Sequence, residues 1–310
     1  MIHIVCCSDT NYLRHTAVML VSLFENNKES EFTVHLIAPQ LDEMEFLRFK
    51  TTVENYHQTL RTYNFDITQL AEFPKTRDYI SSTTWCRLFV QDILPSSIEK
   101  VLYLDGDIIV SGDIIPLWNT DLNEKLLAAV SDEINGYEEY YSRYGFPKDY
   151  VYFNAGVLLI NLKEWRAFDV KKKALDFLKK ENRVELENSD QDLLNIICVG
   201  KTVELPLRYN LQDALCRKKI LHIRKNVEKI LDHEIKEGKV FHFSCPKKPW
   251  RFRCIHPQKE LYYRYLEKTE WKGQIEGIND LDVIYMIFYW VAYALGLTNR
   301  YRKSIKTLET

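Results

Sequence analysis

Two carboxylates that flank one glycine are the residues of this chain best suited to chemistry. Asp105, Gly106 and Asp107 follow the apolar residues 101–104 and precede the apolar residues 108–110. Side chains two residues apart in an extended chain point to the same side, so both carboxylates can reach one divalent cation. The glycine lets a ligand approach the backbone closely. A charged β-turn explains the same three residues, so the motif alone leaves both interpretations open.

Two later segments add groups that suit a cation bound to phosphate. His242 follows an apolar pair and precedes Lys248. One imidazole and two carboxylates form a mixed nitrogen and oxygen ligand set that suits Mn²⁺, and a lysine can neutralise phosphate charge. Taken alone, His242 is better explained as a hydrogen-bonded histidine at a strand end. Asp190 and Asp192 flank Gln191 at a predicted helix start, where capping explains both aspartates as well as catalysis does.

The elements that must position these residues alternate along the chain. Apolar runs predict strands, and helical spacing of apolar residues predicts helices between them. The predicted strands are 2–7, 32–38, 58–65, 100–105, 126–131, 153–161, 203–210 and 240–243, and the predicted helices are 13–27, 41–56, 83–92, 163–181 and 190–199. This alternation predicts an α/β fold with a doubly wound, mostly parallel sheet, which binds its ligands at the carboxyl ends of the strands. Asp9 follows the first of these strands and Asp105 ends a later one, so both would face one crevice.

The segment after the first predicted strand is suited to a nucleotide. Asp9 and Asn11 could hydrogen-bond a base or a ribose, and Tyr12 could stack on a ring, although a helix-capping loop explains the same residues. No GxGxxG pattern follows the strand, which disfavours a dinucleotide enzyme.

A tyrosine-rich segment and the carboxyl-terminal tail stand outside the strand and helix alternation. Residues 133–150 lack apolar periodicity, which predicts a long loop that is either a lid over an acceptor or a solvated surface segment. Residues 280–296 are apolar and aromatic but slightly too short to span a bilayer. The basic residues that follow are Arg300, Arg302, Lys303 and Lys306. This pattern predicts peripheral contact of residues 280–306 with an anionic membrane, and a helix buried against the domain is the alternative.

Composition narrows the classes of function. The 310 residues are 46% apolar with a net charge of −2, which suits a large α/β domain with an appendage and gives no electrostatic case for nucleic acid. The seven cysteines include no CxxC pair, and Met1 leads straight into a predicted strand. We therefore expect reduced thiols and no signal peptide, as in a cytoplasmic protein.

The motifs together resemble glycosyltransferase family 8, the group of bacterial lipopolysaccharide galactosyl- and glucosyltransferases and of glycogenin. The resemblance covers roughly residues 2–257, and its joint order and spacing are more specific than any single motif. It is carried by residues 9–12, 84–88, 102–107, 116–118, 153–157, 190–192, 205–206, 209–210, 242 and 248–250.

The resemblance implies a fold, a reaction and a location. The fold would be a Rossmann-like GT-A nucleotide-diphospho-sugar transferase, with a mixed sheet flanked by helices at residues 1–257 and a helical, membrane-associated segment at 258–310. The enzyme would move a hexose from UDP-galactose or UDP-glucose to an oligosaccharide or lipid-linked glycan such as lipopolysaccharide, with retained configuration. It would use Mn²⁺, or Mg²⁺ in its place, and work in the cytoplasm, peripherally on the inner face of the membrane.

The resemblance also implies roles for single residues. The metal ligands would be Asp105, Asp107 and His242. The uridine loop would comprise Cys7, Asp9, Asn11 and Tyr12, and the residues at the diphosphate would be Arg87, Gly106 and Lys248. The residues around the transferred hexose would be Asp132, Asn154, Asp190 and Gln191, with Gln191 at the position of the family's candidate nucleophile. Two positions depart from the family pattern: Cys245 stands where glycine is common, and Tyr79 where a relative has histidine.

Two other functions fit part of the pattern. A nucleotidyltransferase also uses paired aspartates and a divalent ion, but this chain has no Gly-rich phosphate loop. An inactive nucleotide-sugar-binding protein is the second, and the presence of Asp105, Asp107 and His242 argues against it.

Overall fold

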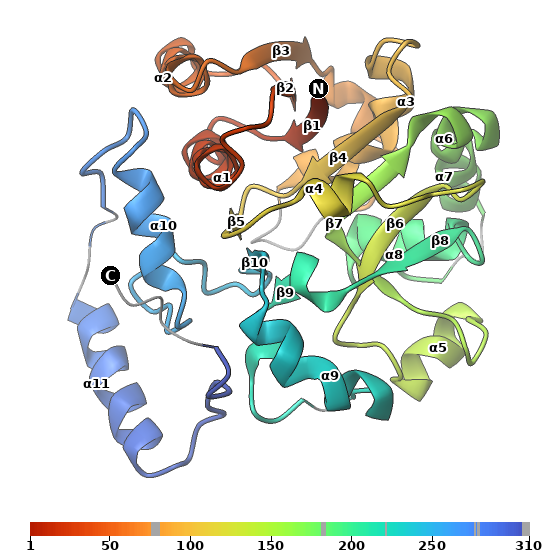
Figure 1. Cartoon of the computed structure of the whole chain (residues 1–310). Helices are drawn as coiled ribbons and strands as arrows, with labels where there is room; N and C mark the ends of the chain where they lie inside the picture. The colour runs from red at the N-terminus through yellow and green to blue at the C-terminus, as the bar shows by residue number, and fades with distance from the viewer. Residues whose placement is uncertain (76–80, 181–183, 221, 276, 278–279, 306–310) are drawn as a thin grey trace.

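A seven-stranded sheet forms the centre of the molecule (Figure 1). The computed structural model describes residues 1–75, 81–180, 184–220, 222–275, 277 and 280–305. The strands lie in the order β3-β2-β1-β4-β7-β6-β8. Their bounds are β1 Ile2–Cys7, β2 Phe32–Ala38, β3 Thr59–Asn64, β4 Lys100–Leu104, β6 Leu127–Ser131, β7 Phe153–Asn161 and β8 Thr202–Leu205. Neighbours are parallel except where β7 pairs with β4 and β6, so the sheet is mostly parallel, as predicted, with one reversed strand.

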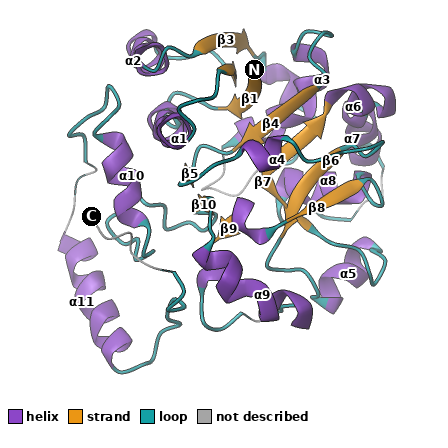
Figure 2. Cartoon of the chain, viewed as in Figure 1, coloured by secondary structure: helices purple, strands orange, loops and turns teal. Residues whose placement is uncertain are grey.

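Alternate residues of the central strands feed a separate core on each face of the sheet. Ile4 and Leu102 join one apolar cluster, while Val5 and Val101 join the other, because successive side chains of a strand point to opposite faces. The helices packed in the first cluster include α1 (Leu13–Asn26), α2 (Glu43–Asn55) and α10 (Lys259–Leu266). Those in the second include η2 (Ser82–Phe89), α3 (Val90–Ile93), α6 (Leu162–Phe168), α7 (Val170–Leu178) and α8 (Ser189–Ile197) (Figure 2).

A second, three-stranded sheet joins distant parts of the chain. Its order is β5-β10-β9, with bounds β5 Ile108–Val110, β9 Leu211–Gln212 and β10 Val240–His242. His242 pairs with Ile108 across the antiparallel β5–β10 ladder. The ladder continues where the Phe243 amide donates to the Asp107 carbonyl at 3.0 Å. Pairing these two short strands therefore brings His242 beside the Asp-Gly-Asp motif.

Three predicted elements are shorter or divided. The helix expected at 163–181 breaks at Asp169, which adopts the left-handed conformation (φ 55°) and caps α7 through the Lys172 amide. The strand expected at 203–210 ends at Leu205, because Pro206 has no N–H to continue a ladder, and η3 (Leu207–Tyr209) follows. The helix expected at 83–92 is η2 followed by α3. The helices α4 (Ile115–Trp118) and α9 (Lys225–Lys236), and the short η1 (Ile67–Leu70) and η4 (Ala214–Cys216), had not been predicted.

The tyrosine-rich segment is not the long loop that its sequence predicts. It contains the helix α5 (Glu138–Tyr144), and its aromatic side chains form a small apolar cluster of their own. The buried members are Tyr140, Tyr141, Phe146, Tyr150 and Tyr152. Irregular spacing concealed this cluster, since its members pack on one another rather than along one helix face.

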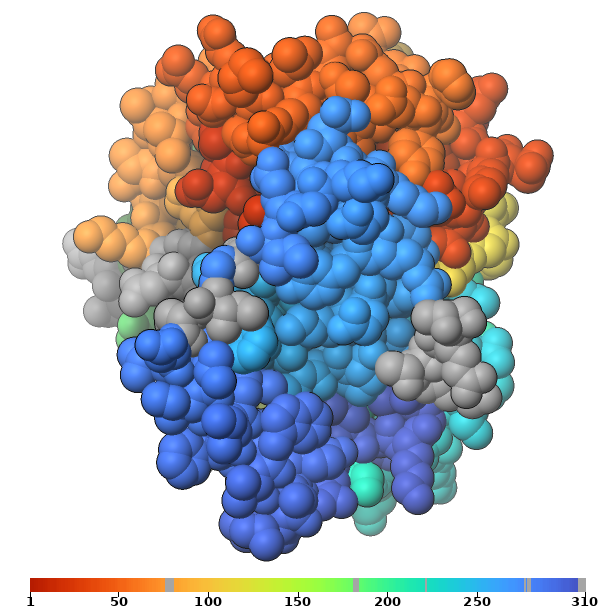
Figure 3. Space-filling model, turned by 90° about the vertical axis from the view of Figure 1, so that its left-hand side faces the viewer, coloured from red at the N-terminus to blue at the C-terminus, as the bar shows by residue number. Residues whose placement is uncertain are grey.

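The carboxyl-terminal residues divide into a packed helix, an exposed helix and a returning strap. Helix α10 belongs to the main core, whereas α11 (Asp280–Ala294) has no buried residue, so the alternative of a helix buried against the domain is wrong (Figures 1 and 3). Beyond α11 the chain returns to the packed part of the molecule, where Tyr301 pairs with Arg217 and Ile305 is buried. We call residues 299–305 the strap. Among the described residues, every helix is too short or too polar to cross a bilayer.

Acid should destabilise this fold through a buried imidazole. His256 packs between the Phe243 and Tyr301 rings, and burial lowers its pKa to about 4. In the unfolded chain His256 takes up a proton as the pH falls below 6.5, its ordinary pKa, whereas in the folded protein it stays neutral until about pH 4. The free energy of unfolding therefore decreases between pH 6.5 and 4. We predict that His256→Asn, which can still accept the Gln258 amide, flattens this fall by on the order of 2–3 kcal/mol.

Urea unfolding across this pH range measures the effect. The exposed His57→Asn is the control, at a positive φ that asparagine tolerates, and it should keep the wild-type slope. Equal slopes for the His256 variant and the wild type would contradict the prediction.

Candidate active site

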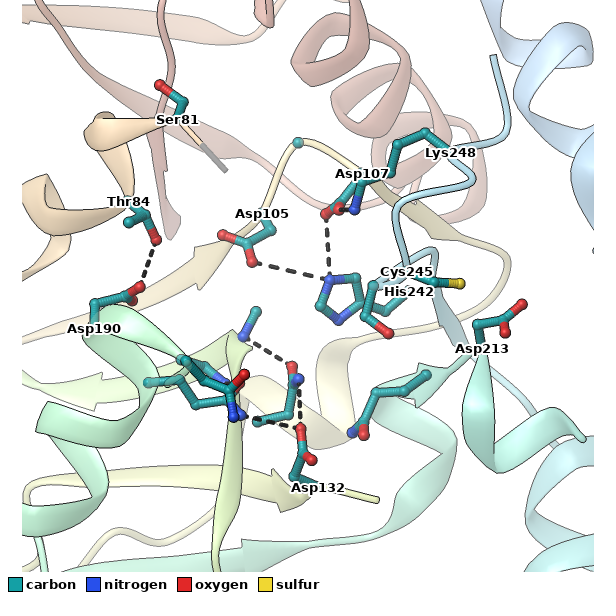
Figure 4. Close-up of a pocket in the computed structure, with 18 of the residues that line it drawn as sticks. Ser81, Thr84, Asp105, Asp107, Asp132, Asp190, Asp213, His242, Cys245 and Lys248 are labelled. Atoms are coloured by element: carbon teal, nitrogen blue, oxygen red, sulfur yellow. Dashed lines mark hydrogen bonds and ion pairs between the residues drawn. The ribbon is translucent and has the colours of Figure 1, made fainter. Parts of the chain in front are cut away.

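A pocket opens at the carboxyl end of β4, between the main sheet and the small sheet (Figure 4). The predicted site residues that line it are Cys7, Tyr12, Arg87, Asp105, Gly106, Asp107, Asp132, Asn154, Asp190, Gln191, His242 and Lys248. Asp9 and Asn11 do not line it. Asp9 shapes the nearby turn, since its carboxylate accepts the Tyr12 amide and the Ser81 hydroxyl.

Asp105, Asp107 and His242 converge at the centre of the pocket. One ligand atom from each lies within 4.8 Å of the others, with His242 Nε2 at 3.3 Å from Asp107 Oδ1 and 3.9 Å from Asp105 Oδ2. Asp105 follows β4, Asp107 precedes β5, and His242 ends β10. Three elements thus present a nitrogen and two carboxylate oxygens to one point, the donor set of a divalent cation site.

The outer oxygens of both aspartates are already held by neighbours. Asp105 Oδ1 accepts hydrogen bonds at 2.8 Å from the Arg87 guanidinium and the Tyr103 hydroxyl, and Asp107 Oδ2 pairs with Lys248 Nζ at 2.5 Å. Asp107 Oδ1, which faces the cluster, is buried and accepts no hydrogen bond of normal geometry. Such an orphaned carboxylate oxygen is what a bound cation would satisfy, so the residues present fit a metal ion.

Charge favours the ionised form of Asp107 despite its burial. Burial disfavours the carboxylate, but Lys248 and then His242 outweigh this and hold the pKa of Asp107 below its ordinary value. A ligand for a divalent cation must be deprotonated, so this environment suits metal binding.

A relay of amides orients the His242 ring. The Gly156 amide, which can only donate, bonds to Asn154 Oδ1 at 3.0 Å, and this identifies the oxygen of that side chain. Asn210 Nδ2 donates to the same oxygen at 2.9 Å, so Asn210 Oδ1 is the atom 3.0 Å from His242 Nδ1. His242 Nδ1 must therefore carry a proton, so in the neutral imidazole the lone pair is on Nε2, which faces the two aspartates.

The other side of the pocket holds three carboxyl groups whose pKa values are raised by burial. Asp190 accepts the Thr84 hydroxyl at 2.7 Å and lies 3.0 Å from Arg87 Nε, so it does not cap the helix; α8 begins after Asn188. Burial raises the pKa of Asp190 to about 6, and Arg87 limits the rise. Burial also raises the pKa of Asp132, which accepts bonds from Asn154 and Gln191, and raises that of Glu133 to about 7.

Several lining residues had no signal in the sequence. The pocket also includes Ser81, Thr83, Tyr103, Glu133, Asn188, Gln212, Asp213, Ser244 and Cys245. Only Glu133 is next to a predicted site residue, and Tyr103, Asn188 and Ser244 lie two positions from one, so adjacency to a motif was a weak clue. Cys245, the departure from the family pattern, contacts Asp213, and its burial raises its pKa. Tyr79, the other departure, lies outside the described residues.

Glycosyltransferase family 8 matches residues 3–254 of this chain. The chain therefore belongs to glycosyltransferase family 8, and the prediction of a glycosyltransferase is confirmed.

Individual relatives agree with this assignment. General stress protein A of Bacillus subtilis (strain 168) is 28% identical over 274 residues, which cover 87% of this chain and 95% of that protein. Lipopolysaccharide 1,2-glucosyltransferase of Escherichia coli (strain K12) is 28% identical over 265 residues, covering 85% and 77%.

The fold also matches a solved family structure. Galactosyltransferase LgtC, determined in complex with donor and acceptor sugar analogs, superimposes with a TM-score of 0.77 at 26% identity and covers 90% of this chain and 98% of that one. The predicted GT-A fold, with its mixed sheet flanked by helices, is thereby confirmed.

Gly156 leaves just enough room for the His242 ring. A Cβ at position 156 would lie 2.3 Å from His242 Cε1 and 3.0 Å from Asp105 Oδ2. We predict that Gly156→Ala displaces the imidazole and destabilises the fold by about 1–3 kcal/mol, the usual cost of overpacking.

Urea unfolding measures the loss, and Gly277→Ala, where an added Cβ meets open space, is the matched control. The prediction fails if the two alanine variants are equally stable.

Proposed function

We propose that this protein transfers a hexose, galactose or glucose, from a UDP-sugar to a glycan or lipid-linked acceptor such as lipopolysaccharide, with retained configuration and a divalent cation, Mn²⁺ or Mg²⁺. The observation that carries the proposal is the convergence of Asp105, Asp107 and His242 around an orphaned carboxylate oxygen, with Lys248 alongside. The names of the relatives support the choice of hexoses, since one is a glucosyltransferase and another a galactosyltransferase.

The charged side chains of the pocket would act on the diphosphate of the departing UDP. A cation held by Asp105, Asp107 and His242 would act as a Lewis acid toward the diphosphate. Lys248 Nζ, 2.5 Å from Asp107 and 2.8 Å from the Phe243 carbonyl, lies beside this position and would add positive charge there. On the other side of Asp105, the buried Arg87 guanidinium would face the donor's phosphates or sugar.

The geometry of Gln191 favours attack from the face that UDP leaves. Its Oε1 already accepts the Ala155 amide at 3.0 Å, and an amide is a poor nucleophile. Asp190, the nearby carboxylate, is paired with Arg87. We therefore favour direct attack by the acceptor hydroxyl, with its proton passing to the departing phosphate, over a covalent intermediate on Gln191.

Product analysis separates the alternatives. A nucleotidyltransferase would release pyrophosphate from a nucleoside triphosphate, whereas an inactive nucleotide-sugar-binding protein would bind the donor without turnover. The proposed enzyme would release UDP and an α-linked product from an α-linked donor.

Removing the charge of one carboxylate should abolish turnover. We predict that Asp107→Asn lowers cation-dependent UDP-hexose hydrolysis by at least about 100-fold, because the donor set loses an anionic ligand beside the diphosphate. Isothermal titration with Mn²⁺ should show the same loss of cation binding. The exposed Asp121→Asn controls for a charge change at the surface. Wild-type turnover in the Asp107 variant would reject the metal role.

We also propose that the protein works on the inner face of the cytoplasmic membrane and touches it through residues 280–306. The exposed apolar side chains of α11 include Ile284, Ile287, Phe288 and Val291, with Phe288 71% exposed. Next to the strap, a cleft is lined by Lys218, Lys236, Arg302 and Lys303 together with Asp232 and Ser304. An apolar helix beside an excess of positive charge suits an anionic bilayer.

Substitutions test this contact better than a deletion, because the strap packs on the catalytic domain. We predict that Ile287→Glu with Phe288→Glu lowers binding to phosphatidylserine-rich vesicles by at least about tenfold, since each side chain loses apolar burial. Co-sedimentation measures binding, and UDP-hexose hydrolysis should persist. Leu47→Glu, on the exposed side of α2, is the matched control. Unchanged sedimentation of the double variant would remove α11 from the membrane contact.

A further inference from the structure

Tyr152 lies directly behind Gln191, outside the set of residues assigned to the site. Its ring is fully buried just before β7. The Tyr152 hydroxyl donates a short hydrogen bond to Asp192 Oδ1 and lies 3.2 Å from Gln191 Nε2. It thus stands between the buried carboxylate of Asp192 and the amide that faces the pocket.

The direction of these hydrogen bonds is fixed at both ends. A phenol has one proton, and the Tyr152 proton is committed to Asp192, so its oxygen can only accept from Gln191. The Ala155 amide can only donate, and it bonds to Gln191 Oε1 at 3.0 Å. Gln191 must therefore turn Nε2 toward Tyr152 and Asp132, and its carbonyl oxygen toward Ala155.

Asp192 is what commits the Tyr152 proton. It is fully buried, and it also accepts the hydroxyls of Tyr140 and Tyr144 and the Asn188 amide. Tyr140 shares Oδ1 with Tyr152, but its hydroxyl also accepts the side-chain amide of Asn188, which lines the pocket. Tyr144 donates to the other oxygen, Oδ2, and its hydroxyl also bonds to the Glu185 carbonyl and the Glu187 amide. Asp192 thus anchors one phenol that contacts Gln191, Tyr152, and one whose partners do not line the pocket, Tyr144.

We propose that Tyr152 is a positioning residue for the transfer reaction, which holds the Gln191 amide in the orientation that presents it to the hexose and to Asp132. This inference rests on the proposed function. It also gives the tyrosine-rich cluster a role. The hydroxyls of Tyr140, Tyr144 and Tyr152 bond to Asp192, and Tyr152 links this network to Gln191, which would contact the reacting sugar.

Two hydroxyl deletions test the proposal against a purely structural role. Tyr152→Phe and Tyr144→Phe each remove one donor from the Asp192 carboxylate, and both should lower the unfolding temperature. With Mn²⁺ and the UDP-hexose that the wild type hydrolyses, Tyr152→Phe should lower kcat about five- to tenfold with unchanged donor KM and unchanged Mn²⁺ affinity, the loss expected for one orienting hydrogen bond. Tyr144→Phe should keep wild-type kcat.

A double-mutant cycle shows whether Tyr152 acts through Gln191. Gln191→Ala should lower kcat, and adding Tyr152→Phe to it should lower kcat no further, because the group that Tyr152 holds is absent. The proposal is overturned if the two phenylalanine variants lose kcat equally, if Gln191→Ala keeps wild-type kcat, or if the losses multiply in the double variant. Absence of wild-type turnover on every UDP-hexose would instead reject the proposed function.

Discussion

The pairing of β5 with β10 is the contact on which the rest of the site depends. Neither strand exceeds three residues, yet their antiparallel ladder aligns His242 with Ile108 and ties Phe243 to Asp107. Asp107 and His242 come from opposite halves of the sequence, and no local preference brings them together. The ladder is held from below by the main core, to which Ile108, Ile109, Val110 and Phe241 all belong. Apolar burial of the two strands thus fixes the distance between Asp107 and His242. Without this packing, these polar groups would favour contact with water over burial beside each other.

Around this contact, opposite charges compensate one another before any ligand arrives. Buried Arg87 lies between Asp105 and Asp190, and buried Lys248 pairs with Asp107. Buried ions are costly unless each is paired and hydrogen-bonded. Each cation holds an outer oxygen and leaves an inner one facing His242. The same pairs therefore make burial tolerable and aim the carboxylates.

The sequence predicted the main sheet well because its central strands are continuous apolar runs, and it predicted the Asp-Gly-Asp motif because the spacing is local. The short strands β5 and β9 escaped, since three or two residues carry no periodicity. The sequence assigned no role to Asn210 or Tyr152 for a different reason: each contacts the site through a hydrogen-bond partner that is distant in sequence. The helix α11 was recognised by its composition, but only the structure shows that it packs no side chain into the core.

The exposed helix is fastened at both of its ends. At its start Arg253 Nε lies 2.6 Å from Asp282, and past its end Asn299 exchanges hydrogen bonds with Lys219 while the Tyr301 hydroxyl donates to Asp213, a residue of the pocket wall. Contacts at both ends fix the orientation of this helix relative to the pocket, which a contact at one end alone would not do. On a lipid surface the helix would hold the pocket mouth at one height and one tilt. The enzyme would then select acceptors by the height of the reactive hydroxyl above the lipid headgroups. This selection would come in addition to recognition of the acceptor sugar itself.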